Sequence, residues 1–151
     1  MLTCFFIGHR DSGEEIYPIL CSEVERHIVE YGVGEFIVGH YGRFDGMAAR
    51  AVRKAKENHP EILLTLLLPY LDRTSPSEGF DGSVYPDGLE LVPRKYAIAR
   101  ANQMMIDRCD CLIAHVNRTY GGAFRCLKYA RGKRIAITRI QGLCQTHRLD
   151  P

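Results

Sequence analysis

The sequence predicts a doubly wound α/β fold, with a mainly parallel five-stranded sheet and helices on both faces. Short apolar runs alternate with helical patterns five times along the 151 residues, which form a single domain, 1–151. The run 62–68 is apolar on both faces, as a central parallel strand requires. Polar turns with glycine follow the first, second and fourth runs, at the edge where such sheets bind ligands.

The first half of the chain is expected to hold three strands and two helices. A buried strand covers 2–7, and apolar residues at helical spacing from Glu14 predict a helix that Gly32 and Gly34 end. A strand covers 35–38. The second helix begins near Asp45 and ends before Pro60, and the third strand is 62–68.

The second half begins with a long irregular connection, 69–93, in which proline and glycine interrupt any periodicity. A connection of this length is typical of a functional lid, an oligomer contact or a mobile segment, and the sequence does not separate these. A helix over 94–107, a strand over 111–116, a helix over 123–131 and a strand over 134–138 follow.

Composition sets limits on function. Apolar residues make up 46% and charged residues 25% of the chain, which is typical of a globular domain, and a net charge of +2 does not by itself indicate nucleic-acid binding. The longest apolar run, 62–68, is too short to span a membrane, and the N-terminus lacks a basic signal-peptide region. Six scattered cysteines without a C-x-x-C pair favour a reducing cytoplasm over disulfides or zinc.

The three glycine turns predict a phosphate or nucleotide site. Glycine lets a backbone approach a ligand closely, and a helix N-terminus offers unpaired N–H groups and the positive end of its dipole. His9 and Arg10 could bind a ligand or be held by local hydrogen bonds. Asp45 could orient a ribose or act as a base, or it could be a helix N-cap. Arg118 and Tyr120 could clamp a phosphate and stack on a base, or form a solvated loop.

Four segments carry a resemblance to a known family: 3–10, the Gly39-x-x-Gly42-x-Phe44-Asp45 turn with Ala48 and Ala49, 100–107 and 121–123. Together they resemble the SLOG superfamily, the Rossmann-like group that includes the DNA-processing protein DprA and the lonely-guy (LOG) phosphoribohydrolases. The similarity is closest to small single-domain bacterial and phage members. It implies a Rossmann-like sheet that binds a nucleotide-derived ligand, often in a homodimer or larger homo-oligomer.

The turns and the resemblance together give a set of candidate residues. Weak catalytic candidates are His9, Asp45 and Arg100. The candidate ligand-binding residues are Gly8, His9, Arg10, Gly39, Gly42, Phe44, Asp45, Arg100, Tyr120, Gly121 and Gly122. The histidines His40, His59 and His115 lack metal-like spacing, so no metal is expected, and no cofactor is predicted.

One departure from the LOG pattern bears on chemistry. Aligned on Gly121 and Gly122, the LOG signature P-G-G-x-G-T-x-x-E places its catalytic glutamate at Lys128. The basic partner of that glutamate could correspond to Arg94 or Arg100. The sequence therefore favours binding of a nucleotide or nucleotide-derived ligand, for example in a sensor, over a nucleotide-processing hydrolase. Without an aromatic series in a basic groove, it argues against nucleic acid as a partner.

Overall fold

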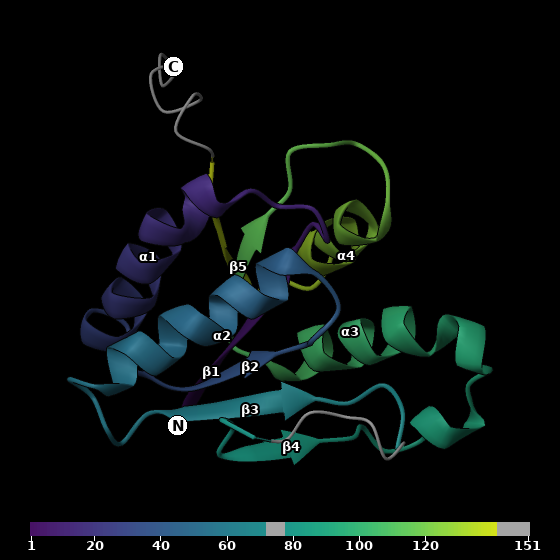
Figure 1. Ribbon diagram of the computed structural model, residues 1–151. Helices are drawn as coiled ribbons and strands as arrows, with labels where there is room; N and C mark the ends of the chain where they lie inside the picture. Colours follow the sequence, from purple (N-terminus) through teal and green to yellow (C-terminus); the bar gives the residue numbers. More distant parts are fainter. Residues whose placement is uncertain (72–77, 142–151) are drawn as a thin grey trace.

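The computed structural model describes residues 1–71 and 78–141 and is built around one parallel sheet (Figure 1). Its six strands lie in the order β4-β3-β2-β1-β5-β6, so β1 is central and the strand order reverses between β1 and β5. A reversal of this kind opens a crevice at the carboxyl ends of the two strands. The strands are β1 (Leu2–Gly8), β2 (Val33–Val38), β3 (Leu63–Leu67), β4 (Gly82–Val84), β5 (Cys111–His115) and β6 (Ala136–Arg139).

Two helices cover each face of the sheet (Figure 1). On one face, α1 (Tyr17–Val29) and α2 (Arg43–Lys56) pack on a core that includes Phe6 and Phe36. On the other face, α3 (Ala97–Arg108) and α4 (Gly122–Arg131) pack on a core that includes Phe5 and Leu112. Alternate residues of β1 therefore point into different layers, as strand geometry requires. Short 3₁₀ turns lie at Glu14–Ile16, Leu89–Leu91 and Arg94–Tyr96.

The doubly wound parallel fold predicted from the sequence is confirmed, with six strands in place of five. The additional strand, β4, lies inside the connection 69–93, where no element was expected. The Asp81 carboxylate accepts the Leu64 N–H at 2.8 Å and pairs with Lys56 at 2.7 Å, and the Leu68 N–H donates to the Val84 carbonyl. A three-residue strand that pairs with β3 through its backbone leaves no alternating apolar pattern to detect. Residues 72–77 of this connection lie outside the described residues.

Several element boundaries differ from expectation for identifiable reasons. The first helical segment opens with a 3₁₀ turn before α1, which has a proline in its first turn. The last strand begins at Ala136 because Arg134 adopts a left-handed backbone, with φ of 60°, that a strand cannot include. The described cysteines are free thiols, and Cys144 lies outside the described residues.

The described helices bear on the predicted absence of a membrane span. Within 1–71 and 78–141, none of the helices has the length and apolar character needed to cross a bilayer. The cytoplasmic location and the homo-oligomer both stay predictions.

Candidate functional site

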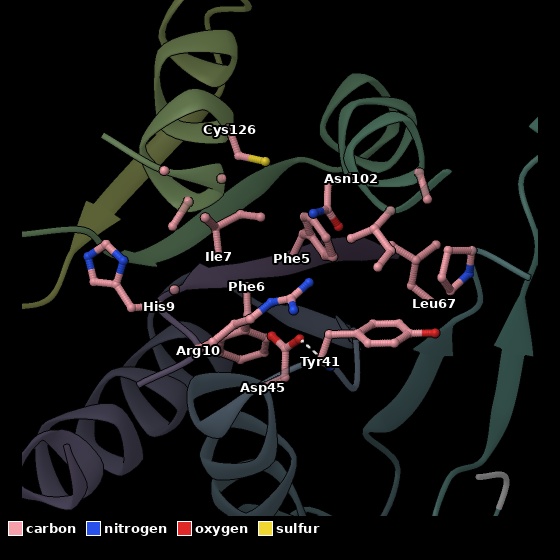
Figure 2. Close-up of a pocket in the computed structure, with 18 of the residues that line it drawn as sticks. Phe5, Phe6, Ile7, His9, Arg10, Tyr41, Asp45, Leu67, Asn102 and Cys126 are labelled. Carbon is pink, nitrogen blue, oxygen red and sulfur yellow. Dashed lines mark hydrogen bonds between the residues drawn. The ribbon is translucent and has the colours of Figure 1, made fainter. Parts of the chain in front are cut away.

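A cavity of about 480 Å³ lies at the carboxyl ends of the central strands, between the two helical layers (Figure 2). This volume falls within the range of small-molecule sites, roughly 300–1,000 Å³. In Figure 2, Arg10, Tyr41 and Asp45 lie on the side of α1 and α2, whereas Asn102 of α3 and Cys126 of α4 lie on the opposite side. The cavity therefore lies where the strand order reverses between β1 and β5.

The turn after β5 opens into this cavity. Gly121 precedes α4 with φ of 92°, a left-handed conformation that favours glycine, and Gly122 is the first residue of the helix. A Cβ added at either position would meet nothing within 4 Å. The first N–H groups of α4 have no carbonyl within the helix to pair with, and Gly121, Gly122 and Ala123 all line the cavity. The geometry presents hydrogen-bond donors and a positive dipole end to a ligand.

The turn after β2 has a similar sequence but is closed by packing. Gly42 precedes α2 with φ of 124°, and a Cβ there would lie 2.6 Å from the Arg10 Cα. A Cβ on Gly8 would lie 2.1 Å from the ring of Phe44, which is itself buried. Gly42 and Phe44 were predicted to bind the ligand, but they do not line the cavity. Both instead make packing contacts between the turns that follow β1 and β2.

Arg10 and Asp45 form the charged part of the cavity wall. Figure 2 shows the exposed Arg10 side chain reaching toward Asp45. The Tyr41 N–H donates to the Asp45 carboxylate at 3.1 Å, and Gly39 leaves room for that carboxylate. Burial raises the pKa of Asp45 to about 7, although Arg10 acts in the opposite direction. Gly42 is the N-cap of α2, so the N-cap interpretation of Asp45 is wrong.

His9 has a bonding role at the ends of β1 and β5. Its Nε2 accepts the Asn117 N–H at 3.0 Å, and burial lowers its pKa. The neighbouring His115, also buried, bonds Ser12 through Nδ1 at 2.9 Å. Acceptance of an N–H requires a neutral imidazole nitrogen, so His9 ties the two turns together while lining the cavity.

An ion pair crosses the mouth of the cavity. Arg118 of the β5–α4 turn pairs with Asp11 of the β1 turn at 2.5 Å, and both residues line the cavity. The pair lowers the pKa of Asp11. Tyr120 lies nearby, with 69% of its surface exposed and its ring 5.9 Å from the Arg118 guanidinium carbon. An exposed aromatic ring at a cavity mouth suits stacking on a base.

Two positively charged candidates lie away from the cavity. Arg100 donates to the Gln103 side chain at 3.1 Å on α3, whose cavity-lining residues are Ile98, Ala101 and Asn102. Lys128 is exposed and lies 5.7 Å from the Phe124 ring. The side chain aligned with the LOG glutamate therefore points out of the cavity. One turn into α4, the side chain that lines the cavity is that of Cys126.

Sequence reasoning missed most of the apolar wall. This wall consists of apolar strand residues, whose sequence pattern predicts core positions, and of small helix residues. Its members outside the helices are Phe5, Phe6, Ile7, Leu67 and Pro69. Tyr41 was also missed, although it lies inside the most prominent glycine turn. An aromatic residue between two glycines was the available signal. In all, the cavity brings together Gly8, His9, Arg10, Gly39, Asp45, Tyr120, Gly121 and Gly122 of the predicted set.

Comparison with known proteins places the fold. No protein-family model matches the chain, and no curated protein matches it in sequence. Among solved structures, the chain is similar to DNA processing protein A (DprA) from Streptococcus pneumoniae, with a TM-score of 0.70 and 14% identity. It is also similar to DprA from Helicobacter pylori, with a TM-score of 0.65 and 17% identity. The alignments cover 94% of this chain but 51% and 66% of those chains.

These likenesses confirm the Rossmann-like fold expected from the sequence, which is similar to the fold of DprA. They also correct one expectation. The sequence argued against nucleic acid as a partner, yet the H. pylori protein binds single-stranded DNA. The prediction was wrong because net charge and aromatic spacing along a sequence do not show which groups the fold gathers. Here the cavity gathers two arginines, Arg10 and Arg118, and two tyrosines, Tyr41 and Tyr120.

Proposed function

We propose that the cavity binds the phosphate-bearing part of a nucleotide, presented either as a free nucleotide or as one unit of single-stranded DNA. The observation that carries the proposal is the open N-terminus of α4, which faces the same cavity as the Arg10 guanidinium. Backbone N–H groups and a forked cation are the two kinds of donor that phosphate oxygens accept best.

The rest of the cavity fits the other parts of a nucleotide. Phe5, Ile7 and Leu67 offer apolar surface, while Tyr41 and Tyr120 place aromatic rings at two sides. Asp45 and Asn102 offer polar atoms that suit sugar hydroxyl groups. A site that combines a phosphate cradle with aromatic rings serves a free nucleotide and a DNA unit equally well.

The single-stranded DNA source draws support from the fold. The H. pylori DprA structure, which shares this fold, describes a single-stranded DNA binding mode. This chain spans about half of the S. pneumoniae DprA chain and 66% of the H. pylori chain, so the activities of those whole proteins do not transfer directly. The cavity alone is the subject of the proposal.

Calorimetry with three probes tests it: thymidine 5′-monophosphate, thymidine and a short oligothymidylate. We expect the monophosphate to bind and thymidine to bind at least about tenfold more weakly, since the phosphate contacts are lost. Affinity that rises with the length of the oligonucleotide identifies DNA as the source, and equal affinity identifies a free nucleotide. Absence of binding by all three probes at millimolar concentration would overturn the proposal.

One observation favours a second function, hydrolysis of a nucleotide at its N-glycosidic bond. A carboxyl group with a pKa of about 7 is suited to general acid–base catalysis near neutral pH, and Asp45 lines the cavity. The position aligned with the LOG glutamate is an outward-pointing lysine, so Asp45 would have to act from a different turn. Binding without turnover is therefore the function we favour.

A further inference from the structure

A second group of chemically reactive side chains lies in the core, on the face covered by α1. Cys4 of β1 and Cys111 of β5 are directly paired across the two parallel strands, and His27 of α1 packs above them. All three side chains are buried, with exposed fractions of 0%, 9% and 1%. Cys111 is the first residue of its strand, so the cluster lies toward the amino ends of the strands, away from the cavity.

The three side chains converge on a common point. One sulfur or nitrogen atom from each lies within 4.8 Å of the corresponding atoms of the other two. Ligand bonds of about 2.3 Å to sulfur and 2.0–2.1 Å to nitrogen imply ligand–ligand separations of roughly 3.5–4.0 Å around one ion. The ligand atoms therefore need to approach one another by about 1.3 Å at most, which rotations about side-chain bonds can supply.

The imidazole is held as a metal-binding histidine would be. Its Nδ1 lies 2.7 Å from the backbone carbonyl oxygen of Glu23, one turn earlier in α1, and can only donate to it. This bond fixes the tautomer and leaves the lone pair on Nε2, the arrangement that outer-shell partners impose on ligating histidines. The remaining neighbour of Nε2, the Thr138 hydroxyl of β6, is at a long 3.4 Å.

We propose that Cys4, Cys111 and His27 bind a divalent, thiophilic metal ion of the zinc type. Two thiolates neutralise the charge of a divalent ion, so the complex is neutral overall and its burial costs less than that of an unbalanced ion. Thiolate and imidazole ligands suit zinc, and the Thr138 hydroxyl, 3.4 Å from His27 Nε2, is a polar group beside the three ligands.

Thiolates and a neutral imidazole are the forms that bind a metal, so binding would displace one proton from each of Cys4 and Cys111. The ligands are far apart along the chain, which explains why cysteine and histidine spacing gave no sign of the site.

Cobalt substitution tests the proposal on the reduced full-length protein. We expect one equivalent of Co²⁺ to bind and to give the thiolate-to-metal absorption of two sulfur ligands, and Zn²⁺ to displace it. The bands should disappear in Cys4→Ala and in Cys111→Ala. The matched control is Cys109→Ala, which removes another buried thiol that packs on the other face and should leave the bands unchanged.

A measurement on the unmodified protein keeps the proposal testable if those variants fail to fold. Zn²⁺ should raise the melting temperature of the wild-type chain, since an ion that binds only the folded state stabilises it. Folded wild-type protein that binds no Co²⁺, or that binds it without thiolate bands, would overturn the proposal. Bands that persist in folded Cys4→Ala and Cys111→Ala variants would overturn it as well.

Discussion

The turns that precede α2 and α4 have the same signature in sequence and opposite roles in the structure. Each follows a buried strand, each has its N-cap glycine at positive φ, and each begins a helix. At Gly42 the space that a side chain would occupy is filled by the backbone of Arg10 at 2.6 Å. At Gly121 and Gly122 that space is open and belongs to the cavity.

The difference shows what a glycine turn in a sequence can and cannot indicate. Positive φ requires glycine at both turns, so its presence reports the backbone conformation. Whether the turn also meets a ligand depends on what packs against it, which here is the β1 turn in one case and a cavity in the other. We therefore propose that the N-terminus of α4 binds the ligand and that the N-terminus of α2 has a packing role.

The largest expected effect is a difference in stability between variants of the two turns. Gly42→Val should lower the free energy of unfolding by about 2–4 kcal/mol, because it adds backbone strain and a clash with Arg10. Gly122→Val should change it by less than about 1 kcal/mol, because the new side chain meets open space. Urea denaturation of both variants measures the contrast. Equal losses of stability would show that the two turns are packed alike.

Gly122→Val should instead lose nucleotide binding, by at least about tenfold, because its side chain enters the cavity. We prefer this substitution to one at Gly121, whose left-handed backbone would be strained by any side chain. The matched control is Gly46→Val in α2, where a Cβ also meets nothing within 4 Å and which does not line the cavity. Unchanged affinity in folded Gly122→Val would remove α4 from the site.

Arg10 takes part in both regions, because its backbone packs against Gly42 while its side chain lines the cavity. Arg10→Ala should weaken binding of thymidine 5′-monophosphate by about 10–100-fold, the loss expected for charged hydrogen bonds to phosphate. Arg43→Ala removes the same charge from the first residue of α2, outside the cavity, and should have little effect. Calorimetry measures both, and equal losses would indicate a general charge effect.

A smaller effect is expected from Asp45, whose ionisation should make both stability and nucleotide affinity depend on pH. Its pKa is about 7 in the folded protein, above the ordinary value of 3.8. The folded state therefore holds this proton more tightly than the unfolded state does. The stabilisation is complete below about pH 4 and is lost as the pH rises through 7. Above pH 7 the ionised carboxylate also repels a phosphate in the cavity, so nucleotide affinity should fall over the same range.

Asp45→Asn is the matched variant, because its side-chain oxygen can still accept the Tyr41 N–H. It should be more stable than the wild type at pH 8 and should flatten the pH dependence of nucleotide affinity. Melting temperatures and calorimetry from pH 5 to pH 8 measure the two effects. A wild-type affinity that stays constant over this range would show that Asp45 does not face the bound phosphate.

The smallest effect is an expected absence of turnover. Cleavage of an N-glycosidic bond builds positive charge on the ribose, which preorganised negative charge must stabilise. The residue aligned with the LOG glutamate is Lys128, so that carboxylate is missing. The lysine itself is exposed and does not line the cavity. Incubation with nucleoside monophosphates should release no free base at rates typical of LOG enzymes. Robust release, abolished by Asp45→Asn, would make Asp45 a substitute catalytic carboxylate.

Most of the fold could be predicted because its signals are local. The apolar run at β3 and the helical spacing of apolar residues in α1 follow from burial on two faces and on one face, respectively. The strand β4 could not be predicted, because it has three residues and pairs with β3 through contacts such as that of Asp81 with Leu64, 17 positions away in the chain.

The sequence could predict where the site lies on the sheet but not which side chains line it. Sheet topology brings the glycine turns to one edge, and that much follows from strand order. Side-chain direction decides the rest. Arg100 and Asn102 are two positions apart on α3, and only Asn102 faces the cavity. The metal ligands proposed above meet only after β1 and β5 pair, so no spacing along the chain records them.

Amide chemical shifts test the central claim most directly, because they report on both glycine turns in one experiment. On titration with thymidine 5′-monophosphate, we predict saturable shifts of the Gly121, Gly122 and Ala123 amide signals, with much smaller shifts at Gly42 and Gly46. This result would place the phosphate at the open N-terminus of α4. Shifts centred on Gly42, or no saturable shifts at the α4 turn, would contradict the account.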